Sequence, residues 1–245
     1  MKITFARDEA EFDLIAAWRI IGQILQKHDS VIGLSTGNTT KGMHTIISAI
    51  HKKYPFDVSG ITLFNVDELT NVPRKYSGSC YSMILHEIAG PLGIPEHNFI
   101  MPPTISDDFT AECRLFEKRL EERGGTDLQI LGIGLNGHIG INQPGTPFES
   151  ETWISTIGPD TDARVRRDLN LSKDIVIGGL TRGIKNIMSS RKIILAAKGE
   201  HKSEIIAKAL LGPVTTDVPA SVLQLHPDCE VLLDAAAATG LKSKR

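Results

Sequence analysis

The chain has 245 residues, of which 41% are hydrophobic, and its 27 Lys and Arg nearly balance its 29 Asp and Glu. This length and composition are ordinary for a globular protein with a sizeable core, and we expect a single domain over residues 1–245. A formal net charge of -2 argues against a nucleic-acid partner. No apolar run approaches the ~20 residues of a membrane span, so no membrane partner is expected.

The three cysteines, Cys80, Cys113 and Cys229, show neither a disulfide framework nor metal-ligand spacing. Such a sparse, odd set is typical of reduced thiols in a reducing compartment. Residues 1–5 lead directly into an acidic stretch without the apolar segment of a signal peptide. The histidines have no metal-binding spacing either. We therefore expect a cytoplasmic protein that holds no metal.

Apolar periodicity predicts helices that alternate with short, continuously apolar strands. The expected elements, in chain order, are helix 8–28, strand 31–34, a helix over about 41–53, strand 61–66, helix 76–88, strand 99–101, helix 107–123, strand 128–131, strand 192–197, helix 203–211 and strand 230–233. Pro91, Gly93 and Pro95 are expected to end helix 76–88. This alternation predicts a Rossmann-like α/β protein, with a doubly wound, mostly parallel sheet and helices on both faces.

Polar segments follow three of the predicted strands directly, at residues 35–40, 67–68 and 136–143. Parallel strands end at the same edge of a sheet, and the ligands of such folds bind beyond that edge. We therefore expect these three segments to form one shared active site.

The loop after strand 128–131 is the most distinctive of these segments, since it holds four glycines and a single histidine, His138. Glycines allow positive φ angles and the close approach of a ligand, and a partly exposed histidine exchanges protons near neutral pH. Asn136 and Gln143 flank this histidine. We predict that His138 is a general acid or base; a loop histidine that only hydrogen-bonds the backbone is the alternative.

Residues 35–40, Ser-Thr-Gly-Asn-Thr-Thr, join a predicted strand to a predicted helix. Free backbone N–H groups at a helix N-terminus, together with hydroxyls, suit a phosphate. The segment matches neither the dinucleotide fingerprint nor the ATP P-loop. A phosphate site is therefore one interpretation, and a simple helix cap with a glycine turn is the other.

Asp67 and Glu68 follow strand 61–66. Adjacent residues at a strand end point in different directions, so only one of these carboxylates needs to reach the cleft. Such a carboxylate is either a general base or a cap for the next segment. Lys202 opens a helix, where the helix dipole disfavours a cation, and an anionic ligand explains that placement more easily than solvent does.

A basic stretch between residues 164 and 182 offers guanidinium donors for a phosphate clamp. A solvated, charged surface is the alternative interpretation. The arginines of this stretch are Arg164, Arg166, Arg167 and Arg182.

Together these motifs resemble the glucosamine-6-phosphate deaminase/isomerase family, which shares a fold with the 6-phosphogluconolactonases. The resemblance runs nearly end to end, and the motifs stand in the family's order. They are Leu34–Thr39, Phe64–Glu68, Ala111–Arg114, Gly132–Gly145, Leu180–Gly183 and Leu223–Pro227. Lactonases usually carry Ser-Leu-Phe-Pro after the loop histidine, whereas Ile139–Pro144 of this chain is closer to the deaminase branch.

The resemblance implies that Asp67 is the base that moves a proton between C2 and C1 of the opened sugar, and that His138 assists ring opening. The phosphate ligands that it implies are Thr36, Gly37, Asn38, Thr39 and Lys202, with Arg164 as a further candidate. The implied reaction converts a 2-amino-2-deoxyhexose 6-phosphate to a ketohexose 6-phosphate and ammonia. Enolisation, proton transfer and loss of an amine require no cofactor.

Two residues beside the loop histidine depart from the family pattern. Asn136 stands where an aspartate is expected, and Gln143 stands where a glutamate is expected. Neutral amides do not stabilise an imidazolium, so we expect His138 to titrate at lower pH and to act as a neutral base or hydrogen-bond partner. The asparagine looks more like the galactosamine-6-phosphate branch, although that branch usually keeps the glutamate. We therefore expect a preference for galactosamine 6-phosphate, with glucosamine 6-phosphate as the other substrate.

Trp153 and Ser155 occupy the places of the Arg and Lys of the hexameric, allosteric deaminases, so we expect no allosteric anion site. The sequence leaves open whether the chain forms a homo-oligomer. Two other functions also stay open: a 6-phosphogluconolactonase-like or other phosphosugar enzyme, and a non-catalytic sugar-phosphate sensor. Retention of Asp67 argues against the sensor.

Overall fold

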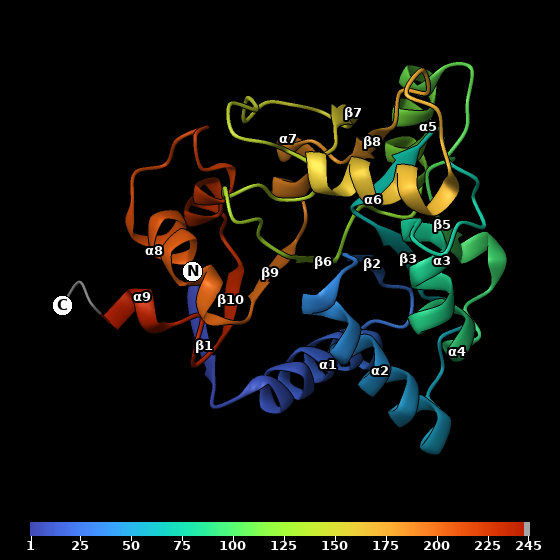
Figure 1. Cartoon of the computed structure of the whole chain (residues 1–245). Helices are drawn as coiled ribbons and strands as arrows, with labels where there is room; N and C mark the ends of the chain where they lie inside the picture. The colour runs from blue at the N-terminus through green and yellow to red at the C-terminus, as the bar shows by residue number, and fades with distance from the viewer. Residues whose placement is uncertain (243–245) are drawn as a thin grey trace.

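The computed structural model describes residues 1–242, and its centre is a seven-stranded parallel sheet in the order β1-β10-β9-β6-β2-β3-β5 (Figure 1). The strands are short and nearly continuous in apolar residues, as is expected where helices cover both faces. Their bounds are β1 Lys2–Ala6, β2 Val31–Leu34, β3 Thr62–Asn65, β5 Phe99–Ile100, β6 Leu128–Leu131, β9 Lys192–Ala197 and β10 Cys229–Asp234.

Side chains that alternate along β9 show that the sheet buries both of its faces. Ile194 packs in a core with α1 (Glu9–Gln26) and α2 (Asn38–Lys53). Its neighbours Ile193 and Leu195 pack in a second core, with α7 (Ile184–Met188) and α8 (Ser203–Leu211). Figure 1 shows α1 and α2 below the sheet and α7 above it. The predicted doubly wound, mostly parallel sheet with helices on both faces is therefore confirmed.

The remaining helices are short, apart from α5 and α6. Their bounds are α3 Cys80–Ile84, the π-helix Leu85–Ala89, α4 Gly90–Leu92, the 3-10 helix Glu96–Asn98, α5 Phe109–Glu122, α6 Pro159–Leu169, the 3-10 helices Glu200–Lys202 and Pro219–Leu225, and α9 Thr239–Lys242. None of the helices within residues 1–242 is long and apolar enough to cross a bilayer.

A second, three-stranded antiparallel sheet was not predicted. Its order is β4 (Asp67–Thr70), β8 (Gly178–Thr181) and β7 (Trp153–Thr156). Only Val66 separates β4 from β3, and β4 begins with the carboxylates Asp67 and Glu68, so no apolar run in the sequence indicates a second strand there. β8 begins with two glycines, a residue type that strands disfavour. The pairing of these strands, rather than their local sequence, produces this sheet.

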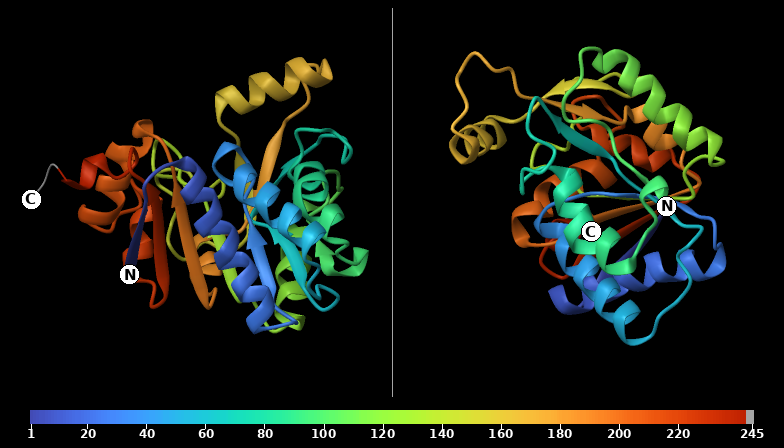
Figure 2. Two further views of the ribbon diagram at one scale, coloured as in Figure 1. Left: turned by 90° about the horizontal axis from the view of Figure 1, so that it is seen from below. Right: turned by 90° about the vertical axis from the view of Figure 1, so that its right-hand side faces the viewer.

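Helix α6 was also missed, because its apolar periodicity is too weak to predict a helix. Val165 is its one fully buried side chain, and it packs under the helix against Leu69, Tyr76 and Ile177. The rest of α6 is mostly charged. Figure 2 shows α6 standing out from the body of the central sheet.

The expected helix 76–88 is wrong at both ends. The helix begins only at Cys80, because the Ser79 side chain accepts a hydrogen bond from the Ser82 N–H and caps it. It then widens into the π-helix and continues to Leu92. Pro91 lies within its last turn, and Gly93, the C-cap with φ of 68°, ends it as expected.

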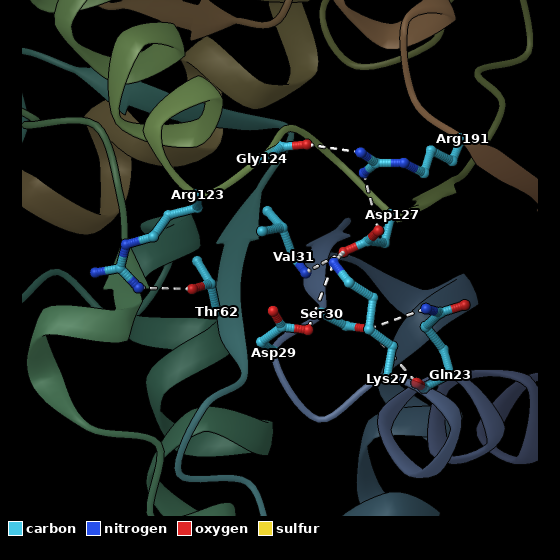
Figure 3. Close-up of polar contacts among 10 residues, drawn as sticks. All are labelled: Gln23, Lys27, Asp29, Ser30, Val31, Thr62, Arg123, Gly124, Asp127 and Arg191. Atoms are coloured by element: carbon cyan, nitrogen blue, oxygen red, sulfur yellow. Dashed lines mark hydrogen bonds and ion pairs between the residues drawn. The ribbon is translucent and has the colours of Figure 1, made fainter.

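A polar network ties the amino ends of the central strands, at the edge opposite the three polar segments (Figure 3). Asp127 accepts hydrogen bonds from the Val31 N–H at 2.9 Å and from Lys27 Nζ at 2.6 Å. Its other oxygen accepts from Arg191 Nη1 at 2.9 Å. These contacts tie the start of β2 to the residues that precede β6 and β9, at the edge of the sheet opposite the three polar segments.

Candidate active site

All ten residues expected in the active site line one cleft of about 1000 Å³ at the carboxyl ends of β2, β3 and β6. They are Thr36, Gly37, Asn38, Thr39, Asp67, Asn136, His138, Gln143, Lys202 and Arg164. The structure brings them together because parallel strands end at one edge and their loops converge there.

The loop from β2 to α2 presents unpaired backbone donors to the cleft. Gly37, the N-cap of α2, has φ of 115°, which glycine adopts without strain. The backbone N–H groups of Asn38 and Thr39 have no acceptor within residues 1–242. Thr40 belongs to the scaffold instead, since its hydroxyl donates to the Ser35 carbonyl at 2.7 Å. Free N–H groups at the start of a 16-residue helix form a suitable anion site.

Asp67 and Glu68 are adjacent carboxylates with different surroundings. Glu68 is fully buried and accepts backbone hydrogen bonds from Leu69, Cys80 and Tyr81, so it anchors the start of α3. Asp67 is partly exposed in the cleft. Its Oδ1 accepts a hydrogen bond from Asn65 Nδ2 at 3.0 Å, whereas its Oδ2 has no partner in the described part of the chain.

Burial raises the pKa of both carboxyl groups. The pKa of Asp67 rises to about 6, although hydrogen bonds from Cys80 and Asn65 oppose the rise. The pKa of Glu68 rises to about 7, against three opposing backbone hydrogen bonds. A carboxylate with a pKa of about 6 is a stronger base than an ordinary aspartate and is still largely ionised at neutral pH, which suits proton abstraction. Of the two, only Asp67 has an oxygen free to perform it.

A chain of three side chains runs through the glycine-rich loop. Asn136 Nδ2 donates to Gln143 Oε1 at 2.9 Å. Asn136 Oδ1 lies 2.7 Å from His138 Nδ1 and also accepts the His138 backbone N–H at 3.3 Å. Since Oδ1 can only accept, Nδ1 of the neutral ring carries the proton and Nε2 keeps its lone pair. The imidazole is therefore oriented as a proton acceptor through Nε2.

The pKa of His138 is lowered, first by burial and then by the positive charge of Lys202. The direction agrees with the expectation from the amide neighbours, but both of these causes come from the fold. Burial also lowers the pKa of Lys202, whose Nζ donates to the Ile133 carbonyl at 2.7 Å. Gly134 makes room for the ring, because a Cβ at that position would lie 2.1 Å from His138 Cε1.

The four arginines of the basic stretch take separate positions. Arg164 on α6 lines the cleft, where its Nη1 lies 3.3 Å from the Tyr76 hydroxyl. Arg166 pairs with Asp162 on the same helix, and the side chain of Arg167 is 74% exposed. Arg182 is buried with Glu117, at 2.9 Å between Nε and Oε1. The prediction that Arg182 belongs to a phosphate clamp is therefore wrong. Arg164 is the arginine of this stretch that lines the cleft.

The cleft also contains residues that the sequence reasoning did not single out. One wall is the turn into α6, residues 157–161. Another is Cys80, whose Sγ lies 3.5 Å from Asp67 Oδ1. Asp67 begins β4 and Cys80 begins α3, with residues 71–79 between these two elements, and no local pattern signals that contact. Within residues 1–242, no three His, Cys, Asp or Glu side chains gather as metal ligands.

The sequence matches the profile of a family described as glucosamine-6-phosphate isomerases/6-phosphogluconolactonase over residues 15–232. A glucosamine-6-phosphate deaminase of Clostridium botulinum (strain Langeland / NCTC 10281 / Type F) is 37% identical over 244 residues, which cover 100% of both chains. Another, from Thermoanaerobacter pseudethanolicus (strain ATCC 33223 / 39E), is 35% identical over 239 residues, which cover 98% of this chain and 94% of that relative.

Solved structures give the same relationship. A monomeric glucosamine-6-phosphate deaminase matches with a TM-score of 0.90 at 35% identity, covering 98% of this chain and 100% of that one. A 6-phosphogluconolactonase from Trypanosoma cruzi matches with a TM-score of 0.78 at 21% identity, covering 98% and 96% of the two chains, which shows a shared fold. As its motifs indicated, the chain belongs to the family of glucosamine-6-phosphate isomerases and 6-phosphogluconolactonases.

Proposed function

We propose that this protein isomerises and deaminates glucosamine 6-phosphate, giving a ketohexose 6-phosphate and ammonia. One observation carries the proposal: a free oxygen of Asp67 and the lone-pair nitrogen of His138 belong to one cleft with the backbone N–H groups at the start of α2. Relatives that match the whole chain are named glucosamine-6-phosphate deaminases, which supports this activity. The reaction needs no cofactor, because it consists of proton transfers and the exchange of an amine for water.

The sugar phosphate binds with its dianionic group at the start of α2. Thr36, Gly37, Asn38 and Thr39 surround this end of the cleft, and Lys202 and Arg164 supply positive charge. Charge-assisted hydrogen bonds of this kind are the strong ones in binding sites. The sugar skeleton fixes how far C1 and C2 lie from the phosphate, so anchoring the phosphate places these carbons near Asp67 and His138.

His138 opens the ring, and Asp67 moves the proton. Nε2 of His138 accepts the proton of the C1 hydroxyl and returns it to the ring oxygen as the ring C1–O bond breaks. Oδ2 of Asp67 then takes the proton from C2 and delivers it to C1. With a proton of the substrate nitrogen passing to O1, this transfer leaves a C1 alcohol and a C2 imine, and addition of water to C2 with loss of ammonia then forms the ketone.

The choice of epimer is part of the proposal. The asparagine at position 136 predicts a preference for galactosamine 6-phosphate. The relatives named above, however, are glucosamine-6-phosphate deaminases, and none of them supports that preference. We therefore take glucosamine 6-phosphate as the principal substrate. We also propose that the enzyme is a single domain over residues 1–245 and lies in the cytoplasm. Analytical ultracentrifugation tests whether it forms a homo-oligomer.

The test is ammonia release by the purified chain with glucosamine 6-phosphate and with galactosamine 6-phosphate. Turnover of the gluco substrate, with ketohexose 6-phosphate formed in equal amount, is the expected result. Preferential turnover of the galacto substrate would return the epimer choice to the one suggested by Asn136.

Two outcomes would overturn the deaminase proposal. Hydrolysis of 6-phosphogluconolactone without ammonia release from either amino sugar would show a lactonase. Binding of the amino sugar phosphates by calorimetry, without turnover of any of these compounds, would show a sensor.

A further inference from the structure

A buried thiol lies between the two ends of the proposed site. Cys80 is the first residue of α3, it is 8% exposed, and it lines the cleft. Its Sγ lies 3.4 Å from Thr36 Oγ1 in the phosphate loop and 3.5 Å from Oδ1 of Asp67. The proposed mechanism gives this side chain no part.

The directions of these hydrogen bonds follow from the chemistry of the groups. An ionised carboxylate only accepts, so the thiol proton of Cys80 points to Asp67. Sγ then has no proton left for Thr36, and the Thr36 hydroxyl donates to Sγ. Burial raises the pKa of Cys80 well above that of an ordinary thiol, and the charges of Asp67 and Glu68 add to the rise, so the donor keeps its proton.

We propose that Cys80 is a positioning residue for Asp67, whose Oδ1 it holds together with Asn65 so that Oδ2 alone is presented to the substrate. The proposal rests on the proposed function in that it takes Asp67 as the base. Both donors bind the same oxygen, Cys80 at 3.5 Å and Asn65 at 3.0 Å. Both bonds stop the carboxylate from rotating about its C–C bond.

Hydrogen bonds at the start of α3 hold Cys80 in place. Its backbone N–H donates to the buried Glu68 carboxylate at 2.8 Å, and Ser79 caps the same helix. The thiol therefore cannot move away from Asp67 without shifting the start of α3. Donors to a carboxylate favour its ionised form, so Cys80 also opposes the rise in the Asp67 pKa that burial causes.

Glu68 is the other titrating group next to the thiol. Its carboxylate accepts a hydrogen bond from the backbone N–H of Cys80 and makes none with Sγ, so its effect on the thiol is electrostatic. His138 and Lys202 line the same cleft, but neither contributes to the pKa shift of Asp67 or of Cys80. Substitution of Asp67 alone therefore distinguishes the effect of Asp67 on the thiol from the effect of Glu68.

The first test is infrared spectroscopy of the S–H stretch in the full chain, which needs no turnover. The Cys80 band is identified by subtracting the spectrum of Cys80→Ala and is followed between about pH 4.5 and 8, a range that brackets the Asp67 pKa of about 6. We expect the band to move to lower frequency as Asp67 ionises, with a midpoint near pH 6. Cys113→Ala, which removes a buried thiol from α5, should leave this transition unchanged.

Asp67→Asn should abolish the transition. A band that does not move with pH, or that moves in the same way in Asp67→Asn, would overturn the proposal, because the thiol would then follow Glu68 or no carboxylate. This result would not touch the deaminase proposal, which ammonia release tests separately.

The second test is the pH profile of kcat/KM. Cys80→Ala should move the acid limb upward by about half to one pH unit, since the ionised base loses a donor. Cys80→Ser restores a donor and should return the limb to the wild-type position or below it. An equal loss of activity at every pH, with the midpoint unchanged in both variants, would mean that Cys80 only fills space.

Discussion

Nδ1 of His138 lies 2.7 Å from Oδ1 of Asn136, and this amide, rather than a carboxylate, sets the state of the ring. The amide leaves the proton on Nδ1 and the lone pair on Nε2, without stabilising the imidazolium. Burial and Lys202 then lower the pKa of the ring. Asn136 thus fixes the tautomer of His138, while burial and Lys202 favour its neutral form, so the ring acts as a neutral base.

Asn136→Asp should raise the pKa of His138 by about 1–3 units, because it sets a negative charge at hydrogen-bond distance from Nδ1. Titration of the His138 ring by NMR measures this shift. Gln26→Glu, the same kind of change at the exposed end of α1, serves as the control and should leave the His138 pKa unchanged. If the pKa is the same in Asn136→Asp, then Asn136 does not control the ring.

Asp67→Asn should lower kcat by about 10²–10⁴ while leaving the affinity for the sugar phosphate nearly unchanged, because the amide keeps the shape but cannot take a proton. Stopped assays and calorimetry on the same preparation measure the two quantities. Full activity in this variant would exclude Asp67 as the base.

Glu68→Gln should act on stability, because the amide group replaces one acceptor oxygen that serves buried backbone N–H groups. We expect a loss of about 1–3 kcal/mol in the free energy of unfolding, measured with denaturant. The sign of its pH dependence follows from the raised pKa of Glu68, about 7 in the folded state. The folded state binds the extra proton, so the wild-type stability advantage over Glu68→Gln should shrink as pH rises from about 4.5 to 7. An advantage that grows over this range would contradict the assignment.

Arg164→Met should raise KM by about tenfold, since it removes a charged donor from the phosphate end of the cleft. Arg167→Met is the matched control, because Arg167 lies on the same helix with its side chain 74% exposed. Initial rates at varied substrate concentration separate the two variants. Equal KM values in both would show that Arg164 does not bind substrate.

Arg182→Met should destabilise the protein by about 3–5 kcal/mol, because it leaves the Glu117 carboxylate partly buried without its partner. Denaturant unfolding of Arg182→Met and of Arg182→Met/Glu117→Gln measures this penalty, and the double variant should recover part of it. A normal free energy of unfolding together with a raised KM would restore Arg182 to the phosphate site.

The wild-type pH profile of kcat/KM should have its acid limb near pH 6, because Asp67 must be ionised to act and its pKa is about 6. Activity is lost as pH falls through that value. The alkaline limb should come from Lys202, whose pKa is lowered by burial. Lys202→Arg should move that limb upward, since a guanidinium stays charged. An alkaline limb that stays in place in Lys202→Arg would assign it to another group.

The sequence by itself determined six of the seven strands of the parallel sheet, all but β1, and the contents of the sheet's carboxyl edge. Continuous apolar runs identify buried strands, and the residues that follow such strands share one edge whenever the strands are parallel. For this reason His138, Asp67 and the loop at 36–39 were all correctly predicted to share one cleft, although they are far apart in the chain.

Only the tertiary structure decided what local patterns do not encode. The β4-β8-β7 sheet depends on pairing across more than 100 residues, as Asp67 opposite Thr181 shows. The same long-range packing brings Arg164 over the cleft, buries Arg182 against Glu117, and sets Cys80 against Asp67. Sequence periodicity reports whether a residue is buried, whereas the partner of a buried polar side chain is chosen by the fold.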